Sequence, residues 1–126
     1  MRRPILTPNA PPPIGPYSQG VAAAGTFLFV SGQGPKDPKT GSMPADVKGQ
    51  TSQCLKNVQA IVEAAGATMA DVVRVGVFLK DLADFKDFNE VYKTFFSEPY
   101  PARTTVQATA PGGILVEIDA IARLKT

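Results

Sequence analysis

The chain has 126 residues, 44% of them hydrophobic, which is enough for one compact domain with its own core, spanning residues 1–126. Thirteen Lys and Arg against eleven Asp and Glu give a net charge of +2 with no basic block, so nucleic acid is an unlikely partner by charge. With no His and one Cys, the sequence excludes Ser-His-Asp and Cys-His catalytic sites, a zinc site of the usual ligands and an internal disulfide.

The N-terminal segment, MRRPILTPNAPPPIGP, is rich in Pro and offers no apolar stretch for export or for spanning a membrane. We therefore expect a soluble, cytoplasmic protein. Residues 17–22 and 26–32 have strand patterns that are joined by three small residues, which predicts an opening hairpin. Residues 34–46 are dense in Gly, Pro, Asp and Lys and predict a loop, at whose end Asp46 can cap a helix.

Apolar residues recur at helical spacing over residues 47–66, and Gly66 is typical of a helix C-terminus. Cys54 lies on the apolar face of this helix, so we interpret it as a small core residue and not as a reactive thiol. Residues 71–80 form a strand pattern rich in β-branched side chains. Residues 81–98 carry five aromatic side chains at helical intervals, which predicts a second amphipathic helix with its aromatic stripe in the core.

Two strand patterns close the chain, at residues 103–109 and 115–124, and the short Gly-rich connection between them predicts a hairpin. The order of elements predicts an α+β fold, in which both helices pack on one face of a single mixed β-sheet. Residues alternate between the two faces of a strand, so in this hairpin Arg103 and Asp119 would be neighbours on the face that no helix covers.

The predicted pair of Arg103 and Asp119 has two interpretations. It can be an exposed ion pair, which would contribute at most about 1 kcal/mol to stability. It can also belong to a site, because an uncovered sheet face that mixes apolar and polar side chains usually meets another subunit. In such a site Arg103 can bind a small carboxylate through two hydrogen bonds, and Asp119 can hold or activate a water.

Six segments of the chain resemble the RidA/YjgF family of reactive-intermediate deaminases, with motif order and spacing preserved over nearly the whole chain. They are NAPPPIGPYSQG (9–20), VSGQGPKDPKTG (30–41), QCLKNVQAIVEAAG (53–66), VFLKDLADFKDFNEVYKTFF (77–96), PARTTVQA (101–108) and LVEIDAIA (115–122). The resemblance implies a chorismate-mutase-like fold and a homotrimer with ligand clefts between subunits. It also implies hydrolysis of 2-imino acids, which arise from 2-aminoacrylate or 2-aminocrotonate, to 2-keto acids and ammonia, without a cofactor or a metal.

The same resemblance assigns site residues. Arg103 matches the arginine of the family motif and would bind the substrate carboxylate, assisted by the backbone N–H of Thr105. The other matched residues that would line or support the cleft are Tyr17, Ser31, Gly32 and Asn89. Without the motif, Tyr17 would be read as a packed aromatic side chain.

Two positions depart from the family pattern. Thr105 stands where the family often has cysteine, and a role for the backbone N–H tolerates this change. Asp119 stands where the family typically has glutamate, and a shorter acid can displace a bound water by about an ångström, which can cost roughly a hundredfold in rate. Glu117, two residues earlier in the strand, could share the role.

Two functions stay open at this point. One is hydrolytic deamination of reactive imino acids. The other is regulation of a partner enzyme by a non-catalytic protein that binds small 2-keto or amino acids in the same cleft. An RNA-cleaving activity is disfavoured, because positive charge is sparse and His is absent.

Overall fold

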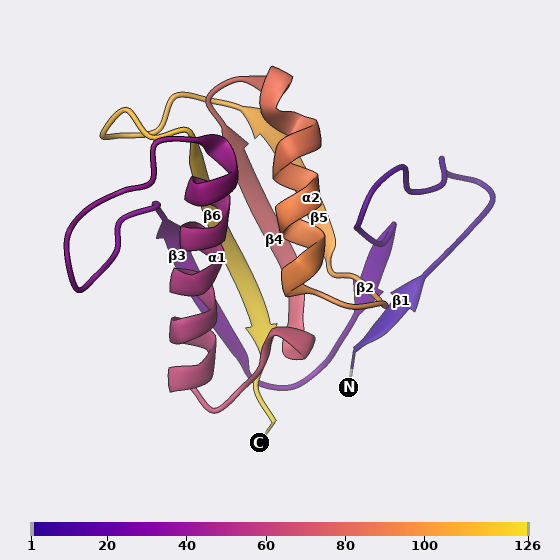
Figure 1. Cartoon of the computed structure of the whole chain (residues 1–126). Helices are drawn as coiled ribbons and strands as arrows, with labels where there is room; N and C mark the ends of the chain where they lie inside the picture. The colour runs from indigo at the N-terminus through magenta and orange to yellow at the C-terminus, as the bar shows by residue number, and fades with distance from the viewer. Residues whose placement is uncertain (1, 126) are drawn as a thin grey trace.

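A computed structural model describes residues 2–125, in which two helices lie side by side on one face of a β-sheet (Figure 1). The elements in chain order are β1 (Arg3–Ile5), β2 (Gly20–Ala22), β3 (Phe27–Gln33), α1 (Val47–Ala64), β4 (Val72–Leu79), α2 (Phe85–Phe95), β5 (Ala102–Gln107) and β6 (Val116–Arg123). Single turns of 3-10 helix, Met69–Asp71 and Leu82–Asp84, precede β4 and α2. The main sheet has the order β3-β6-β4-β5 and is mixed, because β5 runs parallel to β4 while β6 is antiparallel to β3 and β4.

The first helix begins and ends as its sequence predicts. The Asp46 side chain accepts a hydrogen bond from the Gly49 N–H at 2.8 Å and so caps the N-terminus of α1. After the C-terminus, Gly66 has a φ of +84°, a left-handed conformation that favours glycine. Cys54 is fully buried in the core, where its thiol donates to the Val116 carbonyl at 3.4 Å. This confirms its interpretation as a packing residue.

Strand β4 takes the place beside β6 that the predicted hairpin gave to β5. Of its eight residues only Arg74 is exposed, and Val75, Val77 and Leu79 are fully buried. A strand this apolar is most stable when strands flank it on both sides. The predicted pairing of residues 103–109 with 115–124 is therefore wrong, although both strands exist and both helices cover one face as predicted.

The N-terminal part also differs from the prediction. β2 pairs with β1, with Arg3 opposite Ala22, and β3 pairs with β6, so the expected opening hairpin is wrong. β1 and β2 form a separate two-stranded sheet that lies on the β5 side of the main sheet (Figure 1). The fold thus has a four-stranded mixed sheet and a small second sheet, in place of one continuous sheet.

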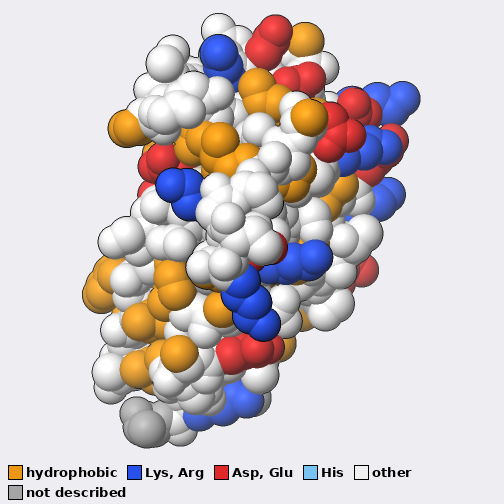
Figure 2. Space-filling view, turned by 60° about the vertical axis from the view of Figure 1, so that its left-hand side comes forward, with side chains coloured by type: hydrophobic (Ala, Val, Ile, Leu, Met, Phe, Trp, Pro, Cys, Tyr) orange, Lys and Arg blue, Asp and Glu red, His pale blue; other side chains and the backbone are white. Residues whose placement is uncertain are grey.

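The face of the main sheet opposite α1 and α2, here called the open face, is covered by no helix within residues 2–125. Phe29 of β3 is 73% exposed, and Val106 of β5 is 42% exposed on this face. Figure 2 views the molecule from the side on which α1, the loop before it and β3 lie in Figure 1, and there apolar side chains reach the surface in several patches among charged ones. Neither helix in the described part of the chain is long and apolar enough to cross a membrane.

Candidate functional site

Arg103 projects from β5 toward α2, where one amide and four aromatic rings surround its guanidinium. Its Nη1 donates a hydrogen bond to Asn89 Oδ1 at 2.8 Å. Its Cζ lies 4.8 Å from the ring centroid of Tyr92, and 5.4, 5.5 and 5.7 Å from those of Tyr17, Phe88 and Phe85. These distances fall within the range of cation–π attraction, so the rings and the amide fix the guanidinium in place.

Helix α2 supplies the amide and three of the four rings around Arg103, because these residues follow one another at helical spacing. Residues 85, 88, 89 and 92 fall on one face of the helix. Phe88 and Tyr92 are fully buried, so the prediction that the aromatic stripe belongs to the core is confirmed for them. Their rings also contact Arg103, a role that the sequence analysis missed. The available signal was Asn89, a polar residue in the middle of an aromatic stripe.

The Arg103 guanidinium has no anionic partner in the described chain, since no carboxylate of residues 2–125 lies within 4 Å of it. Burial lowers the pKa of Arg103, and the neighbouring Tyr92 and Tyr17 act in the opposite direction. An arginine remains charged at neutral pH even so. A small carboxylate at this position would supply the missing counter-charge and could be bound through two N–H groups.

Thr105 lies on the same side of β5 as Arg103, two residues further along. Its hydroxyl oxygen is buried and has no hydrogen-bond partner within residues 2–125. The Ala108 N–H donates to the Leu79 carbonyl of β4, and alternate N–H groups of a strand point in opposite directions. The Thr105 N–H therefore points toward the outer edge of the sheet, where it is available to a ligand.

Asp119 does not lie beside Arg103, which corrects the expected pair. β4 separates the two strands, with Val75 beside Arg103 and Gly76 opposite Asp119. The Asp119 Oδ1 accepts a hydrogen bond from the Gly76 N–H at 3.0 Å. Since Val75 faces the helices and side chains alternate, Asp119 projects from the open face and Arg103 from the covered one.

Ser31 and Gly32 also belong to the open face. The register of β3 and β6 shifts between Val30 and Gln33, so Ser31 and Gly32 form a bulge next to Asp119. The Glu117 side chain lies over this bulge: a Cβ at Gly32 would stand 2.3 Å from Glu117 Oε2. From the sequence, Glu117 is only a residue that could share the role of Asp119. The feature of the sequence that indicates its orientation is Gly32, which leaves room for the Glu117 carboxylate.

The predicted site residues thus form two groups on opposite sides of the main sheet. The covered side carries Tyr17, Asn89, Arg103 and Thr105, which lie around one guanidinium or along the same strand. The open face carries Ser31, Gly32 and Asp119. One chain does not bring the two groups into a common cleft.

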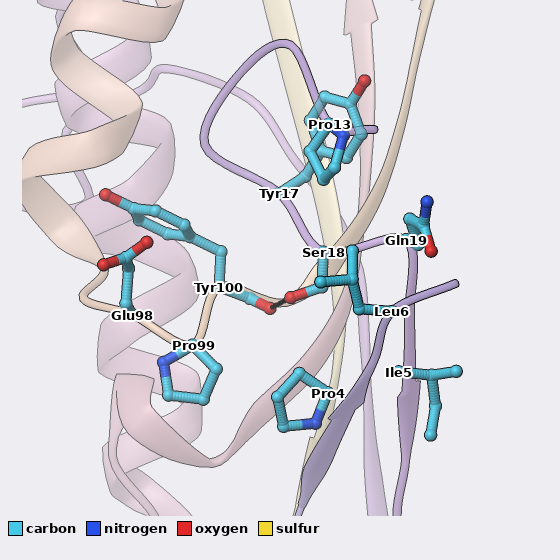
Figure 3. A pocket seen from close by; sticks show the side chains of 10 residues that line it. All are labelled: Pro4, Ile5, Leu6, Pro13, Tyr17, Ser18, Gln19, Glu98, Pro99 and Tyr100. Atoms are coloured by element: carbon cyan, nitrogen blue, oxygen red, sulfur yellow. Dashed lines mark hydrogen bonds between the residues drawn. The ribbon is translucent and has the colours of Figure 1, made fainter. Parts of the chain in front are cut away.

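A cavity of about 430 Å³ adjoins the Arg103 group at Tyr17. Figure 3 shows its mostly apolar lining, with Tyr17 and Pro13 at one end and Pro4 and Pro99 at the other. The Ser18 hydroxyl donates to the Tyr100 carbonyl at 2.5 Å and joins two walls of the cavity. Arg103 is not part of the lining, so this cavity neighbours the candidate site and does not contain it.

Comparison with known proteins identifies the family. The model of the family described as Endoribonuclease L-PSP matches residues 7–124. A RutC family protein of Pyrococcus horikoshii is 52% identical over 97% of this chain and 98% of its own length. The chain belongs to the RidA/YjgF family.

Two relatives within the RidA/YjgF family come from Escherichia coli. A protein of strain K12 named 2-iminobutanoate/2-iminopropanoate deaminase is 50% identical over 97% of this chain and 98% of its own. The crystal structure of TdcF with bound serine has a TM-score of 0.77 at 46% identity and covers 98% of this chain and 99% of that one. The family resemblance of the motifs is confirmed, and proteins named as deaminases are among the relatives.

Proposed function

We propose that this RidA/YjgF protein hydrolyses 2-imino acids, derived from 2-aminoacrylate or 2-aminocrotonate, to 2-keto acids and ammonia. The observation that carries the proposal is the guanidinium of Arg103, which Asn89 and four rings hold in place and which has no anionic partner within residues 2–125. A 2-imino acid supplies that partner as its carboxylate. The deaminase name of the K12 relative and the serine bound by TdcF support a ligand with the skeleton of a small amino acid.

The carboxylate end of the substrate is bound by Arg103 and by the backbone N–H of Thr105. The guanidinium retains N–H groups that Asn89 does not use, and two of them can form parallel hydrogen bonds to a carboxylate. The rings of Tyr17 and Tyr92 lie 5.4 and 4.8 Å from Arg103 Cζ, so cation–π attraction restrains the guanidinium while it binds the substrate. Binding by this end leaves C2 and the imine nitrogen free for reaction.

The attacking water needs a carboxylate to orient it, and we propose that Asp119 of the open face is this carboxylate. Arg103 and Asp119 project from opposite faces of the sheet in one chain, so a single substrate contacts both only when they come from two copies. A homotrimer with clefts between subunits, in which the open face of one copy meets the Arg103 group of the next, satisfies this requirement. The exposed Phe29 and Val106 give the open face apolar area that such a contact would bury.

The chemical demand on this site is modest. A protonated imine is already electrophilic at C2, and the protein has to position a water against it and remove one proton. Neither step requires a metal or an organic cofactor.

The direct test generates the enamine in place. Serine or threonine is converted by a pyridoxal-phosphate-dependent dehydratase, and release of the 2-keto acid is followed with and without this protein. We expect the protein to accelerate release, and the Arg103→Ala variant to lose that effect. If the parent binds 2-ketobutyrate by calorimetry but does not accelerate release, the protein is a regulatory binding protein and not a deaminase.

A further inference from the structure

Residues 7–16, here called the proline segment, lead to Tyr17 and lie beside the guanidinium of Arg103. A Cβ at Gly15 would stand 3.8 Å from Arg103 Nη2 and 3.5 Å from the Tyr17 ring. The Ile14 N–H donates to the Tyr17 hydroxyl at 3.3 Å, and the Tyr17 N–H donates to the Gly15 carbonyl at 2.8 Å. The conformation of the proline segment therefore determines where the Tyr17 ring lies against Arg103.

The proline segment has few means of fixing its own conformation. Five of its ten residues are Pro, which has no backbone N–H and so cannot donate the hydrogen bonds of regular structure. Residues 2–22 include no fully buried side chain, so the core does not hold the segment either. Side chains from outside the segment have to supply the missing hydrogen bonds.

Gln19 supplies four of them through one amide. Its Oε1 accepts the Thr7 N–H at 2.7 Å. Its Nε2 donates to the carbonyl oxygens of Thr7, Ala10 and Pro11, at 3.0, 3.2 and 2.9 Å. This pattern needs a donor and an acceptor on the same side chain, and a carboxylate or an ammonium has only one of the two.

The backbone that carries Gln19 is attached to the strand of the guanidinium. The Ser18 N–H donates at 3.1 Å to the carbonyl of Pro101, two residues before Arg103. The Gln19 amide thus connects β5, which carries Arg103, with the segment that positions Tyr17.

We propose that Gln19 is a positioning residue for substrate binding, which keeps Tyr17 and Gly15 against the guanidinium in the geometry that receives the carboxylate. This inference rests on the proposed function, in which Arg103 binds that carboxylate. Gln19 forms no hydrogen bond with Arg103 in the described chain, so it acts through the proline segment. Because the open face of another copy orients the water, loss of Gln19 should weaken binding and leave the chemical step nearly unchanged.

The test measures ligand binding and turnover in Gln19→Ala and Gln19→Glu. The first variant removes all four hydrogen bonds, and the second keeps a similar shape and the acceptor but cannot donate to the three carbonyls. We expect both to raise the Kd for 2-ketobutyrate in calorimetry, and KM in the dehydratase-coupled assay, by about tenfold or more, with kcat within about twofold of the parent. Melting temperatures should stay near the parental value, since the proline segment lies outside the core.

Gln59→Ala is the matched control. It makes the same substitution on the surface of α1, where the Gln59 amide donates to Glu63 Oε2 at 3.1 Å. Kd, KM and kcat should all be those of the parent.

A double-mutant cycle tests whether Gln19 acts through Tyr17. Tyr17→Ala removes the ring that the proline segment positions, so Gln19→Ala should raise the Kd much less in that background than in the parent. Additive effects would overturn the proposal, because Gln19 would then act by another route. So would an unchanged Kd in Gln19→Ala or in Gln19→Glu, or a loss of kcat at parental KM.

The binding measurement also distinguishes this inference from the proposed function. A parent that binds 2-ketobutyrate in a Gln19-dependent way without hydrolysing imines would overturn the hydrolysis and support the positioning role. A parent that neither binds 2-ketobutyrate nor hydrolyses imines would overturn both.

Discussion

Arg103 combines a full charge with surroundings that remove much of its water. The rings of Phe88 and Tyr92, both fully buried, lie 5.5 and 4.8 Å from its Cζ, and the only side-chain acceptor it binds within residues 2–125 is the neutral amide of Asn89. Burial is the largest influence on its pKa and acts against the charged form. Residues held at such a cost to stability are typical of binding sites, because the ligand recovers the missing interaction.

Replacing Arg103 should therefore affect activity much more than stability. Arg103→Ala should lower kcat/KM by about thirtyfold or more, equivalent to about 2 to 5 kcal/mol for a carboxylate clamp. Arg103→Lys should recover little of this loss, because an ammonium cannot form the two parallel bonds of a guanidinium. The melting temperature of Arg103→Ala should stay near that of the parent, because loss of side-chain packing is offset by removal of a desolvated charge. Parental kcat/KM in Arg103→Ala would refute the mechanism.

Cys54 gives a prediction about alkaline pH. Burial raises the pKa of its thiol from a usual 9.0 to about 12, so the folded state keeps the proton after the unfolded state has lost it. The thiol therefore contributes stability that is complete below about pH 9 and is lost as the pH rises toward 12, at about 1.4 kcal/mol per pH unit. Urea unfolding at neutral pH and near pH 11 should show a smaller decline in Cys54→Ala than in the parent.

The same variant checks that Cys54 has no part in the chemistry. Cys54→Ala should retain turnover at neutral pH while losing some stability, because the thiol packs in the core beneath β6. Loss of turnover in a folded Cys54→Ala protein would contradict this assignment.

At the scale of the elements, β5 matters because it is an edge strand. The Thr105 N–H points away from β4, so a substitution there can remove a donor without breaking the ladder between the two strands. Thr105→Val keeps the N–H and removes a buried hydroxyl that has no hydrogen-bond partner in the described part of the chain, so we expect a gain of about 1 kcal/mol in unfolding free energy. Thr105→Pro removes the N–H, and an edge strand tolerates Pro.

The two Thr105 variants should distinguish the contribution of the backbone N–H to substrate binding from that of the side-chain hydroxyl. If the N–H binds the substrate carboxylate, Thr105→Pro should raise KM strongly, whereas Thr105→Val should retain much more of the parental kcat/KM. Steady-state kinetics on both variants, with melting curves as the control for folding, give the answer. A Thr105→Val loss as large as that of Thr105→Pro would instead assign the role to the hydroxyl.

The elements also show how far the sequence alone can go. Alternation correctly separated the two faces of β5 and of β6, and helical spacing correctly located α1 and α2. The predicted strand pairing is wrong because a short Gly-rich loop does not by itself make a hairpin, and the apolar strand β4 lies between β6 and β5. The succession β4, α2, β5 is also the pattern of a parallel unit with a helical crossover, and it predicts the observed pairing of β4 with β5.

The position of β4 between β5 and β6 also explains why the predicted site is wrong in its geometry. Local patterns identified Arg103 and Asp119 as unusual residues, but their relation in space depends on which strand lies between them. Asn89 and Tyr17 contact Arg103 although each is more than ten residues away in the sequence. Helix and strand periodicity does not predict contacts between such distant residues. Their assignment came from family motifs, and the structure now gives both of them contacts with the guanidinium.

At the scale of the whole molecule, the proposed cleft requires residues from two copies, and this can be tested by mixing variants. Arg103→Ala and Asp119→Asn chains should each be poorly active alone. When they are co-assembled in equal amounts, about a quarter of the clefts in a cyclic oligomer combine an intact Arg103 with an intact Asp119. Activity should then rise toward that fraction, and mass photometry should report trimers. No recovery in mixed oligomers would refute a shared cleft.

The placement of Arg103 and Asp119 on opposite faces has a consequence for dosage. If one chain alone cannot complete a cleft, the rate per chain is not constant but depends on how many chains have found partners. On dilution below the dissociation constant of the oligomer, specific activity would fall as the protein concentration falls. Substrate added before dilution would slow this loss of activity only if it bridges two copies. A cell that doubled its supply of this chain in that regime would more than double its capacity to remove imines.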